Sequence, residues 1–180
     1  MLKLQDSFIE FCEQNNFEVN QEQIEIINLL NKFLNQKDTF LSRILKKKEN
    51  LCFYLYGKVG VGKTMLLNFA YSRLKVNKLR LHFNEFMINF HDFRHEKKEN
   101  NSINSFVKNL KKKYDLIYLD EFQVTNIVDA MILGKLFEEI FSEGIKIIIT
   151  TNTNLNDLYK DGLQREQFLP FISIIKKFSI

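Results

Sequence analysis

The chain has 180 residues, of which 45% are hydrophobic and 18 are phenylalanine, so it can form one domain with a well-filled core. Its net charge of +4 comes largely from lysine runs such as 46–48 and 111–113; these are typical of solvated loops and helix ends, and the alternative is a patch for nucleic acid or an anionic membrane. The sequence contains no apolar run of about twenty residues that would span a membrane, and the acidic residues within 1–20 argue against a signal or transit peptide.

The first predicted helix with a clear start signal follows Asn20. Asn20 with Gln23 three residues later resembles a capping box. The apolar residues from Ile24 to Leu34 then recur on one helical face.

Strands and helices alternate along the rest of the chain. Strands are expected at 51–56, 79–83, 116–119 and 145–150. Helices are expected from the loop after the first strand to about Lys75, through 86–93, at 102–112, and from Ile127 to a stop at Gly144. Residues 95–101 are expected to be a surface loop, and 155–178 to be helical with a break near Pro170. This order predicts an α/β fold with a parallel sheet flanked by helices.

The residues 57–64 match the phosphate-binding pattern G-x-x-x-x-G-K-[ST], between an expected strand and an expected helix. Glycines allow successive backbone N–H groups to turn around an anion, and the following helix adds its positive dipole end. Lys63 would reach the β- and γ-phosphates of ATP, and the Thr64 hydroxyl would bind Mg²⁺. The alternative is a glycine-rich turn with a stray lysine. The residues expected to bind the nucleotide are Gly57, Lys58, Val59, Gly60, Val61, Gly62, Lys63 and Thr64.

Two acids, Asp120 and Glu121, end the apolar strand 116–119, which beside a phosphate loop is the Walker B arrangement. Asp120 would hold Mg²⁺ directly or through water, because Mg²⁺ prefers oxygen ligands. Glu121 would polarise the water that attacks the γ-phosphate, which favours hydrolysis over transfer to another acceptor. The alternative is a strand that ends in ordinary surface acids.

Asn152 and Arg165 are further catalytic candidates. Asn152 follows the fourth expected strand and would help Glu121 orient the attacking water; its alternative is a turn or helix cap, although Asn154 already supplies a cap candidate. Arg165 lies in the region where ring ATPases carry an arginine that reaches into the neighbouring subunit's site. Its alternative is a surface arginine.

Three stretches together resemble the ZapE/AFG-type AAA+ ATPases, a family with a bacterial cell-division factor and a mitochondrial quality-control factor. Residues 122–125 and 161–165 are its more specific parts, whereas the phosphate loop is generic. The resemblance covers about 20–172. Its stretches are 54–64, 119–125 with 129–133, and 157–166 with 168–172.

The resemblance implies an AAA+ ATPase core at 20–180, after an N-terminal helical segment at 1–19, that hydrolyses ATP with Mg²⁺ as a homo-oligomer. It makes Arg165 the expected arginine finger. It also implies that the chain remodels a protein partner: in the bacterial cytoplasm the division protein FtsZ, in mitochondria membrane-associated respiratory proteins. Phe86 and Met87 would lie near a substrate-facing loop, although their spacing favours core packing on a helix.

The chain departs from the family in two places. Asn126 stands where the family usually has an acid. Family members continue beyond the position of Ile180 through a fifth strand and a helical lid, and 178–180 resemble the start of that strand. Weak nucleotide affinity and weak hydrolysis are therefore expected.

Three other functions stay open. A nucleotide-binding module without turnover would follow from the lack of a lid. A DNA-binding protein of the helicase-loader type is supported only by the lysine runs, so nucleic acid is not an expected partner. A small-molecule kinase would need lid arginines that are not recognisable.

The cysteines and histidines match no metal-site spacing. Cys12 and Cys52 lie far apart, and Cys52 is expected in the core of the first strand. His82 is expected in a strand, and His91 and His95 are expected to face solvent.

Overall fold

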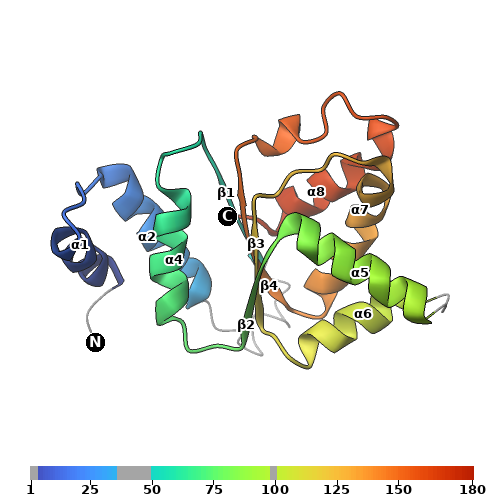
Figure 1. The fold of residues 1–180 in the computed structure, drawn as a ribbon, viewed down its shortest axis with the longest axis horizontal. Coiled ribbons are helices and arrows are strands. Elements are labelled where there is room, and N and C mark those ends of the chain that lie inside the picture. Colours follow the sequence, from blue (N-terminus) through green and yellow to red (C-terminus); the bar gives the residue numbers. More distant parts are fainter. Residues whose placement is uncertain (1–3, 36–49, 98–100) are drawn as a thin grey trace.

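The structure is a computed structural model that describes residues 4–35, 50–97 and 101–180 (Figure 1). Its centre is a four-stranded parallel sheet in the order β1–β4–β3–β2. The strands are β1 (Cys52–Tyr56), β2 (Lys78–His82), β3 (Leu116–Asp120) and β4 (Lys146–Thr151). Neighbouring parallel strands need crossover connections, and the helices between the strands supply them. The predicted α/β fold class is thus confirmed.

Helices cover both faces of the sheet (Figure 1). One face carries α1 (Leu4–Gln14), α2 (Gln21–Leu34) and α4 (Lys63–Arg73). The other carries α5 (Phe83–Lys97), α6 (Ser102–Lys111), α7 (Ile127–Ser142) and α8 (Leu169–Phe178). Two short 3₁₀ helices, η1 (Leu155–Asp157) and η2 (Arg165–Gln167), lie between β4 and α8. No helix within the described ranges is long and apolar enough to cross a bilayer.

The sheet separates two apolar cores because side chains alternate along each strand. On β3, Leu116 and Tyr118 face the α4 side, whereas Ile117 and Leu119 face the α7 side. Every residue of β3 is buried, as expected for a central parallel strand.

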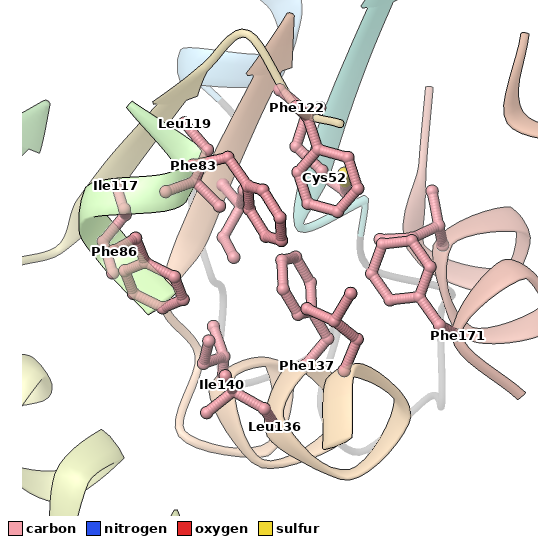
Figure 2. Packing of buried hydrophobic residues seen from close by; sticks show 14 of the residues in the cluster. Cys52, Phe83, Phe86, Ile117, Leu119, Phe122, Leu136, Phe137, Ile140 and Phe171 are labelled. Atoms are coloured by element: carbon pink, nitrogen blue, oxygen red, sulfur yellow. The ribbon is translucent and has the colours of Figure 1, made fainter. Parts of the chain in front are cut away.

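Aromatic rings fill much of the larger core (Figure 2). Phe122, which follows β3, stacks on Phe171 of α8 with ring centroids 5.4 Å apart, and its centroid lies 4.2 Å from that of Phe83. The chain that leaves β3 is therefore anchored one residue after Glu121.

The start of α2 differs from the predicted capping box. Asn20 is the N-cap, and its side chain accepts a hydrogen bond from the Glu22 N–H. Gln23 does not complete the box, because its Oε1 has no partner among the described residues and its Nε2 approaches the Val61 carbonyl at 3.5 Å. The Gln23 side chain thus packs against the phosphate loop and does not contribute to the cap that Asn20 forms.

Several predicted boundaries were wrong. β2 begins and ends one residue earlier than expected, and α5 continues to Lys97 through part of the expected loop. The segment 155–178 is not one broken helix: Pro170 lies in the first turn of α8, where its missing N–H leaves no helical bond unmade. Residues 46–48 and 98–100 lie outside the described ranges.

Other predictions are confirmed. Phe86 and Met87 are 1% and 2% exposed, so they belong to the core and not to a substrate-facing loop. Cys52 is fully buried in β1. Gly144 ends α7 with a left-handed φ of 68°. Residues 178–180 were expected to resemble the start of a further strand. Of these, Ile180 lies beside β1, where its N–H donates to the Cys52 carbonyl at 3.0 Å.

Candidate active site

The loop between β1 and α4 has a backbone that only glycine adopts readily. Gly60 and Gly62 have φ angles of 85° and 84°, in the left-handed region. Gly62 is the residue that precedes the first turn of α4, so the positive end of that helix faces the loop. Free N–H groups at a helix start, behind a glycine-rich turn, make a binding site for phosphate.

A cleft of about 330 Å³ lies over this loop and the carboxyl ends of β3 and β4. Parallel strands bring their carboxyl ends to the same edge, which is where ligands bind in such sheets. Of the predicted site residues, Gly57, Lys58, Val61 and Arg165 do not line the cleft. Those that line it are Val59, Gly60, Gly62, Lys63, Thr64, Asp120, Glu121 and Asn152.

Lys63 places its ammonium group inside the loop. Its Nζ donates to the Gly57 carbonyl at 2.6 Å, to the Lys58 carbonyl at 2.9 Å and to Asn152 Oδ1 at 3.0 Å. The last bond connects the loop to the end of β4. A positive charge held by three acceptors at the mouth of an anion site can turn towards a phosphate with little rearrangement.

Asp120 is 5% exposed and both of its carboxylate oxygens are engaged. Thr150 Oγ1 donates to Oδ1, and Arg80 Nη2 donates to Oδ2 at 2.7 Å. Burial alone would raise the pKa of Asp120, but the hydrogen bonds from Thr150 and Arg80 and the charge of Arg80 outweigh it, so the pKa lies below its usual value. The carboxylate is therefore ionised at neutral pH.

The donor set suits Mg²⁺. The Thr64 hydroxyl and the Asp120 carboxylate line the same cleft, and both are oxygen donors of the kind that Mg²⁺ prefers. Mg²⁺ usually takes only one or two protein ligands and completes its shell with water and phosphate oxygens. The residues present thus fit a nucleotide-bound magnesium ion.

Glu121 has a strained backbone that β4 holds in place. Its φ is 53°, in the left-handed region. Its N–H donates to Thr150 Oγ1 at 3.3 Å, and the next N–H, of Phe122, donates to the Thr150 carbonyl at 2.8 Å. The Glu121 side chain is 79% exposed, and its Oε2 lies 3.7 Å from Nδ1 of His82. Glu121 therefore projects a largely exposed carboxylate from a backbone that is hydrogen-bonded to β4.

Asn152 and Arg165 have different surroundings. The helix-cap alternative does not apply to Asn152, because Asn154 caps η1 by accepting from the Asn156 N–H at 3.0 Å. Arg165, in η2, donates from Nη2 to the Asn156 carbonyl at 2.7 Å, and its Nε is buried without a partner in the part of the chain that the structure describes. The structure brings Asn152 to the cleft and holds Arg165 in the segment that follows it.

Three side-chain partners of the acidic pair were missed by sequence reasoning, as were the cleft-lining residues Met65 and Thr151. Arg80, Thr150 and His82 contact Asp120 or Glu121. The signal for two of them was the alternation of polar and apolar residues along β2, which places Arg80 and His82 on one face. Their partners depend on β2 pairing with β3, where His82 lies opposite Asp120.

The expected solvent exposure of His91 was wrong. Its Nε2 lies 2.7 Å from Asp129 Oδ1, and Asn126 also holds Asp129 by accepting from its N–H. Asn126, in the position where an acid was expected, is thus the N-cap of α7.

Comparisons with known proteins agree with this geometry. The family model described as AFG1-like ATPase matches residues 6–179. Lactation elevated protein 1 homolog B of Danio rerio is 40% identical over 139 residues, which cover 70% of this chain and 28% of that protein. Cell division protein ZapE of Escherichia coli K12 is 38% identical over 126 residues, which cover 69% of this chain and 34% of that protein. The chain spans about a third of the length of the curated relatives that it matches.

Solved structures show the same fold at lower identity. The DnaC helicase loader has a TM-score of 0.61 at 16% identity, with 90% of this chain and 89% of that chain covered. AMPPCP-bound DnaA from Aquifex aeolicus has a TM-score of 0.57 at 21% identity, with 88% of this chain and 47% of that chain covered. These neighbours show that the chain shares their α/β fold. The match of the family model over 6–179 shows that the chain belongs to the AFG1-like ATPase family.

Proposed function

We propose that this chain binds ATP with Mg²⁺ and hydrolyses it, and that the hydrolysis drives remodelling of a protein partner. The observation that carries the proposal is the convergence of Lys63, Asp120, Glu121 and Asn152 on one cleft. They come from α4 and from the ends of β3 and β4, so a glycine-rich loop, an ionised acid and an exposed carboxylate line the same cleft. Family membership supports the same reaction.

Each group has a distinct task in this proposal. The loop N–H groups and the start of α4 hold the phosphates, and Lys63 turns from its carbonyl partners towards the β- and γ-phosphates. Thr64 and Asp120 hold Mg²⁺, which neutralises phosphate charge when bound. Glu121 accepts a proton from the attacking water. Asn152 orients that water. After turnover, Asn152 Oδ1 again accepts the hydrogen bond from Lys63 Nζ.

Arg165 is proposed to act in a neighbouring subunit. Arg165 does not line the cleft of its own chain. Leu163, two residues before it, is 76% exposed, so this segment lies at the surface, where a neighbouring subunit could contact it. An arginine that reaches a neighbour's γ-phosphate stabilises transition-state charge and typically contributes about 10³–10⁵ in rate. The active form is then a homo-oligomer, in which adjacent chains complete one site.

The protein partner is proposed from the relatives. The name of ZapE describes a cell-division protein, and a chain of that role would act in the cytoplasm on division proteins such as FtsZ. A role like that of the mitochondrial members would instead direct it to membrane-associated proteins. Both settings use the same ATPase site.

The test is steady-state ATP hydrolysis with Mg²⁺, titrated over protein concentration. Lys63→Ala serves as the blank, and Lys135→Ala, on the exposed face of α7, controls for the loss of one lysine charge. Specific activity that rises with protein concentration and disappears in Lys63→Ala is the expected result. ATP binding without turnover above the blank would replace the proposal with a nucleotide-binding module.

A further inference from the structure

Arg80 contacts one of the two candidate magnesium ligands, Asp120, without belonging to either motif. Its Nη2 donates to Asp120 Oδ2 at 2.7 Å, and its Nη1 donates to Asn68 Oδ1. Its guanidinium also lies over the Tyr118 ring, 4.8 Å from the centroid. Three contacts from β3 and α4 therefore fix one side chain of β2.

The contact with Asn68 links Arg80 to the phosphate loop helix. Asn68 lies one helical turn after Thr64 on α4, so the two side chains share a face of that helix. The path Thr64–Asn68–Arg80–Asp120 thus joins the start of α4 to the end of β3. A shift of one motif relative to the other must stretch or break the bonds of Arg80.

The contact with Asp120 changes what that carboxylate offers to a cation. An ionised carboxylate has about four lone-pair sites, and Thr150 and Arg80 each occupy one. A guanidinium is always protonated, so its charge opposes that of the acid at every working pH. The Asp120 side chain is 7% exposed, which limits the screening of this pair by water.

We propose that Arg80 is a positioning residue that sets the affinity of the cleft for divalent cations, by offsetting the charge of Asp120 and fixing its carboxylate against α4. With the charge of the ionised Asp120 offset by Arg80, the cleft holds Mg²⁺ weakly by itself and binds it mainly as the nucleotide complex. This inference rests on the proposed function, because it assumes a Mg²⁺–nucleotide site at Thr64 and Asp120.

A purely structural role makes a different prediction. An arginine that only braces β2 against α4 would lower stability when removed and would leave the Mg²⁺ dependence of nucleotide binding unchanged. An arginine that offsets Asp120 would shift that dependence towards lower Mg²⁺, because removal of a nearby like charge strengthens cation binding.

The experiment measures binding of a methylanthraniloyl-ADP probe to the whole chain while Mg²⁺ is titrated. In Arg80→Met, the half-saturating Mg²⁺ concentration is expected to fall by about three- to tenfold. Arg80→Gln keeps hydrogen-bond donors without charge and should shift in the same direction; it also serves if the methionine variant does not fold. Arg80→Lys keeps the charge and should stay close to wild type.

Arg73→Met is the matched control. Arg73 lies at the end of α4, where its guanidinium covers the Phe69 ring at 3.8 Å, so its removal takes the same charge from the α4 side of the sheet without touching Asp120. The half-saturating Mg²⁺ concentration of this variant should equal that of wild type. Melting temperatures without Mg²⁺ report any loss of stability separately.

The outcomes distinguish this inference from the proposed function. Wild-type nucleotide binding that ignores Mg²⁺ would overturn the proposed function and this inference with it. Mg²⁺-dependent wild-type binding with an unchanged or higher Mg²⁺ requirement in Arg80→Met and Arg80→Gln would overturn the role of Arg80 alone. A shift in Arg80→Lys as large as in Arg80→Met would overturn the account by charge.

Discussion

Lys63 and Asn152 are joined by a hydrogen bond of 3.0 Å from Nζ to Oδ1, although 89 residues separate them in sequence. The bond connects the phosphate loop with the end of β4, so the position of each side chain depends on the position of the other. It also means that Asn152 contacts the group that must move when a phosphate binds. The strand end next to Glu121 is therefore coupled to the loop.

Asn152→Ala is expected to lower the maximal rate of ATP hydrolysis by about 10- to 100-fold. The attacking water would then be oriented by Glu121 alone, and Lys63 would lose one hydrogen-bond acceptor. Nucleotide affinity should change little, since the loop N–H groups remain. Asn154→Ala, two residues later, removes only the cap of η1 and should destabilise the fold by about 1 kcal/mol without an effect on rate. Equal rate losses in both variants would contradict the catalytic role of Asn152.

Glu121→Gln is expected to abolish most hydrolysis, by about 10²-fold or more, because an amide cannot accept the proton of the attacking water. The substitution keeps the side-chain shape, and the side chain is largely exposed, so the melting temperature should not change. Binding of methylanthraniloyl-ATP should persist, which separates loss of chemistry from loss of the site. An unchanged rate would exclude Glu121 as the base.

Glu121→Gly should stabilise the protein while it removes activity. The φ of 53° at Glu121 is unfavourable for any residue with a Cβ, and glycine adopts it freely. The relief of left-handed backbone strain, roughly 1–2 kcal/mol, exceeds the cost of the greater freedom of glycine in the unfolded chain, roughly 0.5–1 kcal/mol. We therefore expect the free energy of unfolding to rise by about 0.5–1 kcal/mol in urea titrations. Glu138→Gly, at an exposed position within α7, is the control and should lower it by about 1 kcal/mol. A loss of stability in both variants would show that the backbone at Glu121 is not strained.

Asp120→Asn tests the pH dependence of the buried ion pair with Arg80. The folded pKa of Asp120 lies below the ordinary value of 3.8, so its contribution to stability is present above pH 3.8 and is lost as the pH falls through the folded pKa. At pH 7 the variant should be less stable than wild type by about 1–3 kcal/mol, because Arg80 keeps a charge without its partner.

The same difference in stability should begin to narrow as the pH falls below 3.8, where Asp120 of the unfolded wild-type chain binds a proton, and it should vanish once the pH is below the lower folded pKa. Urea titrations at several pH values between 3 and 7 measure it. Asp161→Asn, at an exposed acid, is the control and should stay within about 0.5 kcal/mol of wild type. A difference that stays constant down to the lowest pH would contradict the lowered pKa.

The parts of the site that sequence predicted are those set by local pattern. The phosphate loop depends on glycine spacing, and Asp120 and Glu121 depend on an apolar strand just before them. Arg80 could not be predicted as the partner of Asp120, because that contact requires β2 to lie next to β3, and strand order is a property of the whole sheet. The predicted capping role of Gln23 was wrong for a related reason, because its side chain packs against Val61 and does not bond to the start of its own helix.

Pro170 shows the limit of a local rule. A proline breaks a helix in its interior and is tolerated in the first turn, and the sequence alone did not decide where α8 begins. The burial of Phe168 and Phe171 in the core places that start at Leu169.

Arg165 provides the test of shared sites between subunits. Arg165→Ala alone should lower hydrolysis by about 10³-fold or more if the guanidinium acts on the neighbour's γ-phosphate. Its bond to the Asn156 carbonyl is lost as well, so melting temperature must be measured beside rate. Arg165→Lys, which keeps charge without the planar fork, should recover only part of the rate.

Mixing two inactive variants separates action in trans from action in cis. Glu121→Gln has an intact Arg165, and Arg165→Ala has an intact Glu121, so an oligomer with both chains contains some interfaces with a complete site. Activity should therefore appear when the two purified variants are combined, and it should depend on total protein concentration. Arg165→Ala mixed with Lys63→Ala should behave in the same way, whereas Glu121→Gln mixed with Lys63→Ala should stay inactive, because both lesions lie in the same half of the site. Absence of activity in every mixture, with oligomers present by light scattering, would assign Arg165 to its own chain.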